Sequence, residues 1–228
     1  MILYAIPTPL GGAPNAALAP SALQTVATLK DFAVENAKSA RAFLGDLGMQ
    51  VRDLNIQEIG DNVGPLLQPL REGRPLGLLS EAGCPAIADP GAALVEAAHR
   101  EGFRVVPLVG PSSIVLALMA SGLEGQRFAF CGYLPREPLK RKMRIKELEN
   151  RSLREDETEI FIETPYRNEA LLAALLESCR GTTKLCIAAD LTLPTESIGT
   201  KTIAQWRRSP APVGRRPAVF LLLANSDG

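Results

Sequence analysis

Two loops rich in glycine and proline are the residues best suited to hold a ligand. Residues 80–92 read SEAGCPAIADPGA and residues 109–113 read VGPSS, each directly after an apolar run. Glycine and proline at the end of a strand let the backbone turn sharply and come close to a bound molecule. Two such loops after parallel strands meet where open α/β sheets bind their ligands. We therefore expect them to line a cofactor cleft.

The elements that position these loops alternate between short apolar strands and helical patterns. Alternation of this kind predicts βαβ units and a mainly parallel sheet, here in an N-terminal α/β domain of residues 1–112. The expected strands are residues 2–6, 32–34, 56–59, 76–79 and 105–109, and the expected helices are residues 20–29, 37–47, 63–71 and 92–101.

The second half has a different pattern. Ser112 or Ser113 can cap a helix that runs to Met119. Residues 192–205 alternate in polarity, which is typical of an antiparallel hairpin rather than a crossover. We expect a second α/β domain with a mixed sheet in residues 113–228. Its expected strands are residues 128–133, 159–162, 184–188 and 218–223.

Composition narrows the class of protein. The 228 residues carry no net charge, with 25 Lys and Arg against 25 Asp and Glu, which argues against a surface coated with nucleic acid. No apolar run reaches the roughly 18 residues of a membrane span, and residues 2–6 look like a first strand rather than a signal peptide. The four cysteines lack metal-site spacing, so we expect reduced thiols in a cytoplasmic protein, with neither zinc nor disulfides. They are Cys84, Cys131, Cys179 and Cys186.

Six motifs, spread over both halves, carry a resemblance to a known family. In order they are IPTPLG at residues 6–11, SEAGCPAIADPGA at 80–92, LVGPSS at 108–113, GYLPRE at 132–137, FIETPYR at 161–167 and RPAVFLL at 216–222. With these motifs the chain resembles the S-adenosylmethionine-dependent methyltransferases of the tetrapyrrole methylase fold. Within that family it is similar to the shorter relatives of the branch that methylates ribose 2′-hydroxyls of small-subunit ribosomal RNA.

The resemblance implies a fold, a cofactor and a set of contacts. It implies two α/β domains with S-adenosyl-L-methionine in the cleft between them, no metal, and a homodimer. The family's cofactor contacts correspond here to Pro9, Ala82, Gly83, Cys84, Pro85, Ile87, Ser112, Ser113, Glu163, Thr164, Ala188, Ala189, Pro217 and Ala218.

The chain also departs from the pattern of the branch. Cys84 stands where the branch has threonine, and residues 163–167 read ETPYR instead of ESPHR. Ala189 replaces an arginine, and residues 215–217 replace a Lys-Gly-Glu. The cofactor motifs are retained more fully than those facing RNA, so these departures concern the ribosomal substrate more than methyl transfer.

The residues suggest how methyl transfer would proceed. Transfer from sulfur is an in-line displacement, so the protein aligns the reactants and, for a hydroxyl acceptor, removes a proton. Glu81 and Glu163 follow expected strands and are candidate catalytic carboxylates; Glu163 could instead accept hydrogen bonds from the cofactor ribose. Arg167 is a candidate clamp for a phosphate or a carboxylate. An ion pair on the following helix is an equally good interpretation of Arg167.

Basic residues between positions 136 and 146 are candidates for contact with RNA. Lys140, Arg141, Lys142 and Arg144 could follow a phosphate backbone, although a solvated helix or loop explains them as well. Trp206 with its two following arginines has the same two interpretations. Asp89, ahead of Pro90 and Gly91, is expected to cap a helix. His99, the single histidine, is expected to face solvent.

Two other functions remain open from the sequence. One is carbon methylation of a porphyrin or corrin precursor, which needs an arginine-lined trough. The other is a cofactor-binding protein without methyltransferase activity. This alternative remains because Ala189 stands where the branch has an arginine. Nicotinamide chemistry and nucleotide hydrolysis are disfavoured, because the chain lacks both the GxGxxG fingerprint and a Walker loop.

Overall fold

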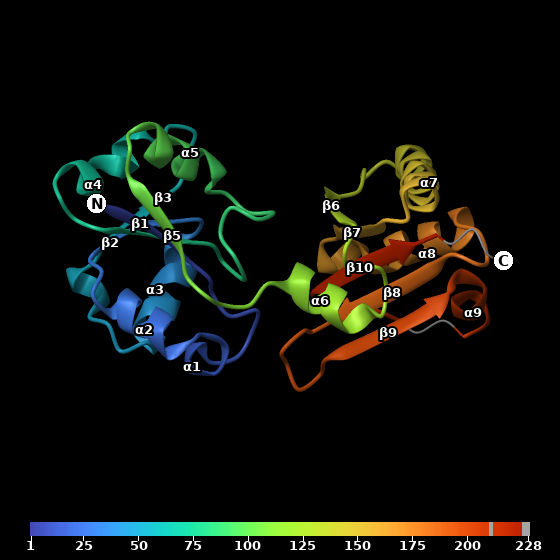
Figure 1. Cartoon of the computed structure of the whole chain (residues 1–228). Helices are drawn as coiled ribbons and strands as arrows, with labels where there is room; N and C mark the ends of the chain where they lie inside the picture. Colours follow the sequence, from blue (N-terminus) through green and yellow to red (C-terminus); the bar gives the residue numbers. More distant parts are fainter. Residues whose placement is uncertain (210–211, 225–228) are drawn as a thin grey trace. The chain divides into compact units, whose positions relative to one another are not determined.

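Two separate five-stranded sheets organise the chain (Figure 1). The computed structural model describes residues 1–209 and 212–224. It divides into an N-terminal unit, Met1–Ser112, and a C-terminal unit, Ser113–Gly228.

The sheet of the N-terminal unit has the strand order β3-β2-β4-β1-β5, and every pairing in it is parallel. Its strands are short, and β2 and β4 are buried throughout, whereas β3 is mostly polar and exposed. The predicted parallel sheet is therefore confirmed. The strands are β1 (Ile2–Ile6), β2 (Asp31–Val34), β3 (Asn55–Glu58), β4 (Leu76–Leu79) and β5 (Arg104–Pro107).

Helices cover both faces of this sheet because its strands carry buried side chains on both sides. One apolar cluster packs Leu3 and Leu78 with residues of α4 and α5, and another packs Phe32 and Val34 with residues of α2 and α3. Asn36 caps α3, accepting from the backbone N–H of Ser39. The helices are α1 (Pro14–Ala17), α2 (Pro20–Ala27), α3 (Ala37–Asp46), α4 (Gln68–Arg71) and α5 (Ala92–Arg100), with 3₁₀ turns η1 (Val51–Asp53) and η2 (Gly64–Leu67).

Two expectations for this unit are wrong in detail. The helix expected over residues 63–71 is a 3₁₀ turn followed by a single short α-helix, because Pro65 and Pro69 interrupt it. Asp89 does not cap α5. The residue before that helix is Gly91, with φ +135°, and no side chain caps the helix.

The sheet of the C-terminal unit is mixed, with the order β6-β7-β10-β8-β9. β6 and β7 are parallel, whereas β10 is antiparallel to both β7 and β8. β9 forms the expected antiparallel hairpin, with β8 as its partner. The predicted mixed sheet is confirmed. The strands are β6 (Phe128–Tyr133), β7 (Thr158–Ile162), β8 (Lys184–Ala189), β9 (Ser197–Thr202) and β10 (Ala218–Leu223).

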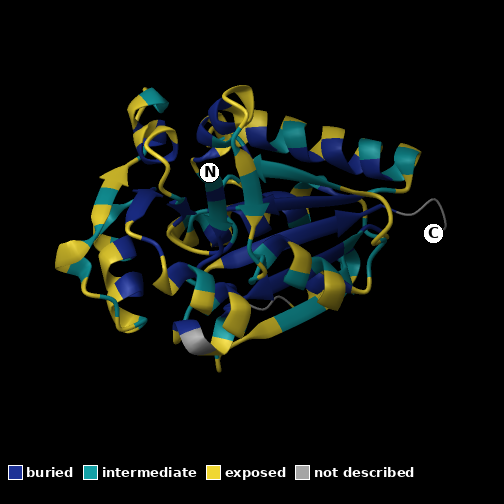
Figure 2. Cartoon of the chain, turned by 60° about the vertical axis from the view of Figure 1, so that its left-hand side comes forward, coloured by how far each residue is buried: buried dark blue, intermediate teal, exposed yellow. Residues whose placement is uncertain are grey.

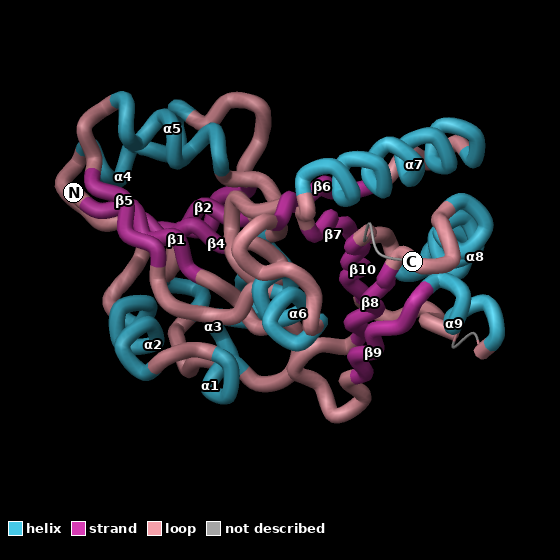
Figure 3. The backbone as a smooth tube through the Cα atoms, turned by 45° about the vertical axis from the view of Figure 1, so that its right-hand side comes forward, coloured by secondary structure: helices cyan, strands magenta, loops and turns pink. Residues whose placement is uncertain are grey.

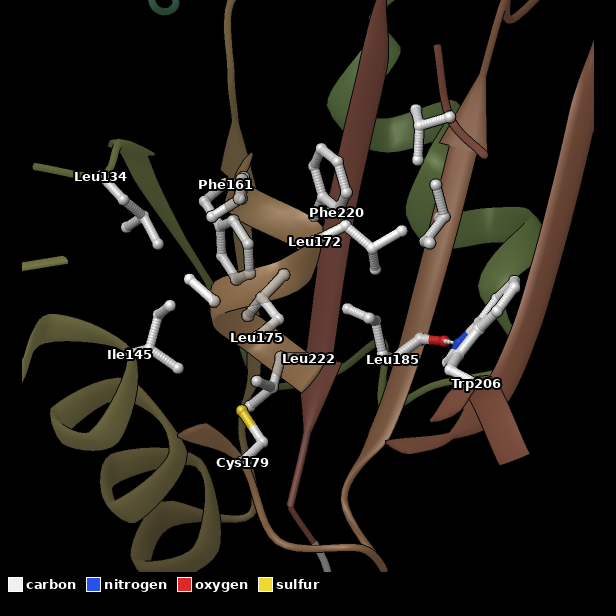
Figure 4. Packing of buried hydrophobic residues seen from close by; sticks show 14 of the residues in the cluster. Leu134, Ile145, Phe161, Leu172, Leu175, Cys179, Leu185, Trp206, Phe220 and Leu222 are labelled. Carbon is white, nitrogen blue, oxygen red and sulfur yellow. Dashed lines mark hydrogen bonds between the residues drawn. The ribbon is translucent and has the colours of Figure 1, made fainter. Parts of the chain in front are cut away.

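Figure 4 shows the main core of this unit, which packs one face of the sheet against helices. The rings of Phe161 and Phe220 lie parallel, with centroids 6.1 Å apart. Trp206 is buried there and its indole N–H donates to the carbonyl oxygen of Leu185 at 2.9 Å, so it is a core residue and not a candidate for RNA contact. The helices are α6 (Ser113–Ser121), α7 (Pro138–Glu155), α8 (Asn168–Ser178) and α9 (Ile203–Arg208), with the 3₁₀ turn η3 (Pro165–Arg167).

The highly charged segment after β6 folds as one continuous helix, α7, of 18 residues. Its buried positions recur every three or four residues, so one stripe faces the sheet and the other residues face solvent (Figure 2). No helix in residues 1–209 and 212–224 is long and apolar enough to cross a membrane.

Candidate functional site

In the N-terminal unit, the loops after β1, β4 and β5 meet at the carboxyl edge of the sheet. Thr8 and Gly83 exchange two backbone hydrogen bonds, of 2.8 and 3.0 Å. The Cys84 thiol donates to the carbonyl oxygen of Pro111 at 3.4 Å. The predicted contacts Pro9, Gly83 and Cys84 are thus brought beside the loop that ends in Ser112.

The loop after β4 has a strained backbone. Ala86 and Ala88 both have φ +66°, a left-handed conformation that costs a non-glycine residue about 1–2 kcal/mol. Gly83 has φ +79°, and a Cβ there would lie 3.2 Å from Leu10 Cδ2. Gly83 and Pro85 are buried, whereas Ala82 and Ile87 are exposed. Strain of this kind is retained where the surrounding structure fixes a ligand-binding backbone.

Carboxylates surround the start of this loop. Glu81 Oε1 accepts from the Ser39 hydroxyl at 2.7 Å, and the Glu81 N–H donates to Glu35 Oε2 at 2.9 Å. Burial, aided by Glu35 and Glu81, raises the pKa of Asp89 from 3.8 to about 6, although a hydrogen bond with Ser80 opposes the shift. Sequence reasoning missed Glu35, because its proximity depends on the pairing of β2 with β4.

In the C-terminal unit, the predicted contacts lie along one edge of the sheet, where β7 and β8 end and β10 begins. We call it the β7 edge. Val219 of β10 pairs with Ile162 of β7, and Ala218 pairs with Ala189 of β8. Beyond the ladder, the N–H of Asp190 donates to the carbonyl oxygen of Pro217 at 3.0 Å. The sequence motifs at residues 163–167, 188–191 and 216–218 are therefore neighbours in space.

Not every predicted contact is at the surface of this edge. Ala188 and Ala189 have no exposed surface, and Ala218 is 7% exposed. Ala189 and Ala218 both belong to the hydrophobic core. The side chains of these alanines therefore offer little surface to a bound molecule.

Glu163, Thr164 and Arg167 form a compact network directly after β7. The guanidinium of Arg167 forms an ion pair with Glu163, and its Nε donates to the Thr164 hydroxyl at 3.0 Å. The Thr164 N–H donates to Glu163 Oε1 at 2.7 Å. Arg167 is therefore directed toward Glu163, so of the two interpretations of this residue the structure shows the ion pair.

Three buried polar atoms beside this network have no hydrogen-bond partner among the described residues. They are Glu163 Oε2, Arg167 Nη1 and Asn168 Oδ1. A buried polar atom without a partner costs about 1–3 kcal/mol, so such atoms mark a place where a bound molecule can complete the bonding. The site thus offers two acceptors and one donor.

Asn168 is a residue that sequence reasoning missed. It has no exposed surface, and its amide nitrogen donates to the carbonyl oxygens of Gly214 at 3.1 Å and Arg216 at 2.8 Å. It fastens the loop before β10 to the start of α8. Asparagine directly after a tyrosine-arginine motif gave no signal of this, because the bonded carbonyls are 46 and 48 residues away.

The basic residues of α7 lie on different faces of the helix, so one of them is buried and the others are at least partly exposed. Arg141 is buried, and its Nη1 donates to the carbonyl oxygen of Arg136 at 3.4 Å, so the prediction that Arg141 contacts RNA is wrong for this structure. Lys142 pairs with Glu177 at 2.5 Å, and Arg144 pairs with Glu147 at 3.1 Å. Lys140 pairs with Glu137 at 2.9 Å, yet its side chain stays 73% exposed.

Comparison with known proteins agrees with this architecture. The chain is similar to "Ribosomal RNA small subunit methyltransferase I" of Mesorhizobium japonicum, with 35% identity over 88% of this chain and 67% of the relative. It is 32% identical to the Vibrio cholerae protein of the same name, over 90% of this chain and 69% of that one. The crystal structure of the methyltransferase CobJ has the same fold, with a TM-score of 0.63, 20% identity, and coverage of 98% of this chain and 93% of CobJ.

A family model also matches most of the chain. The model describes the Tetrapyrrole (Corrin/Porphyrin) Methylases, and it matches residues 17–206. That range contains the loop after β4, the loop after β5 and the network at the end of β7. The chain therefore belongs to the tetrapyrrole methylase family.

Proposed function

We propose that the protein transfers a methyl group from S-adenosyl-L-methionine to RNA of the small ribosomal subunit, at a ribose 2′-hydroxyl. The observation that supports it most is the similarity to ribosomal RNA small subunit methyltransferases, at 30–35% identity over 83–99% of this chain for seven of the relatives. The solved methyltransferases of similar fold, among them a uroporphyrin-III and a cobalt precorrin-4 methyltransferase, match at only 14–20% identity, and that likeness shows the fold alone.

The loops of the N-terminal unit fit a cofactor that approaches the backbone closely. A side chain at Gly83 would press on Leu10, and one at Gly110 would lie 2.4 Å from Pro7 Cβ. At both positions the protein's own side chains occupy the space of a Cβ, so glycine lets the loops pack closely together. When bound, S-adenosyl-L-methionine supplies an activated methyl group. We propose that Pro9, Ala82, Gly83, Cys84, Pro85, Ile87 and Ser112 contact it.

The network at the end of β7 fits the polar part of the same cofactor. Glu163 Oε2 is a buried acceptor without a partner among the described residues, and a ribose hydroxyl is a donor of the right kind. Arg167 holds the other carboxylate oxygen and so fixes the direction of the unpaired one. We propose that Glu163 binds the cofactor and that Arg167 positions Glu163.

A ribose hydroxyl needs a base before it attacks the methyl group, and we propose Glu81 for that step. Glu81 is exposed at the end of β4, unlike the buried Glu163. Its hydrogen bond from Ser39 holds the carboxylate in one orientation, which is what a proton acceptor needs.

We further propose that the protein is a cytoplasmic homodimer. For the dimer, helix α6 exposes large apolar side chains, with Val115 48% and Met119 76% exposed, and such surface marks protein contacts. Light scattering of the wild type and of Met119→Lys tests the dimer.

For the cytoplasm, the thiols of Cys131 and Cys179 have a pKa raised to about 12, chiefly by burial, so both stay protonated, as suits reduced cysteines.

Two measurements test the enzymatic proposal. Titration calorimetry with S-adenosyl-L-methionine tests cofactor binding, and transfer of a labelled methyl group tests the acceptor. We expect label in unmodified small-subunit ribosomal RNA and none in uroporphyrinogen. Label in uroporphyrinogen alone would favour tetrapyrrole methylation. Tight cofactor binding with no transfer to either would favour a binding protein without this activity.

A further inference from the structure

Two exposed tyrosines follow neighbouring strands at the β7 edge. Tyr133 ends β6 and is 54% exposed, and Tyr166 lies in η3, after β7, and is 66% exposed. β6 and β7 are neighbouring strands (Figure 3) and run parallel. Tyr133 pairs with Ile162. Tyr166 is four residues beyond Ile162, which is at most about 14 Å of extended chain. Both rings therefore belong to the same end of the sheet.

The ring of Tyr166 is held from one side. The Arg167 guanidinium carbon lies 5.8 Å from the ring centroid, within the range of a cation–π contact. Arg167 is itself fixed by its ion pair with Glu163 and its bond to Thr164. A ring that is restrained in this way and still largely exposed loses little further freedom when a planar group stacks on it.

Exposed cations begin three residues after Tyr133. Arg136 is exposed, and the buried Arg141 bonds to its carbonyl oxygen and so supports the turn. Lys140 follows on the first turn of α7, with a side chain that is 73% exposed. Between residues 132 and 146 the only acidic residue is Glu137. This part of the surface is therefore complementary to a phosphate backbone.

We propose that Tyr133, Tyr166, Arg136 and Lys140 bind an unpaired segment of the substrate RNA, the rings stacking on bases and the cations contacting phosphates. The proposal rests on RNA being the substrate, as argued above. Aromatic rings beside a cationic track are how proteins bind single strands without reading their sequence. Bases of a duplex are already stacked and cannot use the rings. The surface therefore selects unpaired RNA.

The test compares binding of a short oligouridine with binding of an RNA duplex of equal length, by fluorescence anisotropy. We expect Tyr166→Ala to weaken oligouridine binding by about fivefold to a hundredfold, with Tyr166→Phe close to the wild type. Phe128→Ala is the matched control: Phe128 is an exposed aromatic residue at the opposite end of β6, and we expect no effect there.

The cations have a separate readout in the salt dependence. Lys140→Gln is expected to lower the slope of log affinity against log salt by about 0.7, while Tyr166→Ala leaves that slope unchanged. Arg154→Gln is the matched control, since Arg154 lies at the other end of α7, is 71% exposed and also pairs with a neighbouring glutamate.

The outcomes separate this surface from the proposed function. Wild-type methyl transfer to ribosomal RNA together with unchanged oligouridine affinity in Tyr166→Ala would overturn the surface and leave the function standing. Tyrosine-dependent oligouridine binding without methyl transfer would support the surface and contradict the function. If the protein bound the duplex as tightly as oligouridine, or bound neither, the proposal that this surface binds unpaired RNA would be overturned.

Discussion

Thr8 and Gly83 each donate a backbone N–H to the other's carbonyl oxygen, at 2.8 and 3.0 Å, and so join the loop after β1 to the loop after β4. The two residues are 75 positions apart in the chain. Because this bridge fixes the path of residues 81–87, the geometry of the proposed cofactor loop depends on the backbone conformation at Gly83.

Gly83→Ala is expected to weaken binding of S-adenosyl-L-methionine at least about tenfold, a loss of about 1.4 kcal/mol. The added Cβ would lie 3.2 Å from Leu10 Cδ2, in a residue with φ +79°. Gly102→Ala is the control, since Gly102 has φ +77° and open space around it. Calorimetry should show a loss for the first variant alone. Equal affinities would remove Gly83 from the site.

Arg167→Ala is expected to destabilise the protein by about 3–5 kcal/mol, because it leaves the Glu163 carboxylate buried without its partner. The Glu163 side chain has no exposed surface. Arg154→Ala, which breaks an exposed pair with Glu155, should cost no more than about 1 kcal/mol. Urea denaturation compares them. If both variants lost about the same small amount of unfolding free energy, the Glu163–Arg167 pair would not behave as a buried ion pair.

Asp89→Asn is expected to change how stability depends on pH. Burial raises the pKa of Asp89 from 3.8 to about 6, so the folded protein holds this proton more tightly than the unfolded chain does. The stability that this group contributes is complete below its unfolded pKa and is lost as the pH rises through about 6. The asparagine variant cannot ionise, so its advantage over the wild type should grow between those values and then level off.

Denaturation of both proteins at a series of pH values checks this. Asp61→Asn serves as the control, because Asp61 is exposed. A constant difference between wild type and Asp89→Asn across the range would mean that Asp89 titrates as an ordinary surface carboxylate.

Glu81→Gln is expected to lower kcat for methyl transfer by about 10²–10⁴-fold, the usual contribution of a positioned base. Cofactor affinity should be retained, since the amide preserves the shape of the side chain. Glu96→Gln, on the exposed face of α5, is the control. Single-turnover transfer measures the step. A wild-type rate in Glu81→Gln would mean that Glu81 only stabilises the loop after β4 and does not act as the base.

Much of the fold could be predicted because most of the strands are short apolar runs between turn residues. The strands at Ile2–Ile6 and Leu76–Leu79 lie where the sequence places them. Helix α9 is not among the predicted elements, because its start lies within the alternating stretch that forms β9. The capping box of Thr202 and Gln205, which starts it, could have been recognised.

The site was harder to predict because its residues act on partners distant in sequence. The loops could be found from glycine and proline, yet Glu35 near Asp89 and Asn168 near Gly214 depend on strand pairing. The sequence suggested a surface position for Arg141 because arginine is charged and charged residues are mostly exposed. It lies on the same stripe of α7 as Ile145, Leu148 and Ser152, and that spacing does indicate burial.

The central claim is that a methyl group passes from S-adenosyl-L-methionine to a ribose of small-subunit ribosomal RNA. Mass spectrometry of nucleosides, after incubation of the purified protein with unmodified RNA and the labelled cofactor, tests it most directly. The account predicts one labelled nucleoside with the methyl group on its sugar. A methyl group on a base, or unlabelled RNA from a protein that binds the cofactor, would contradict it.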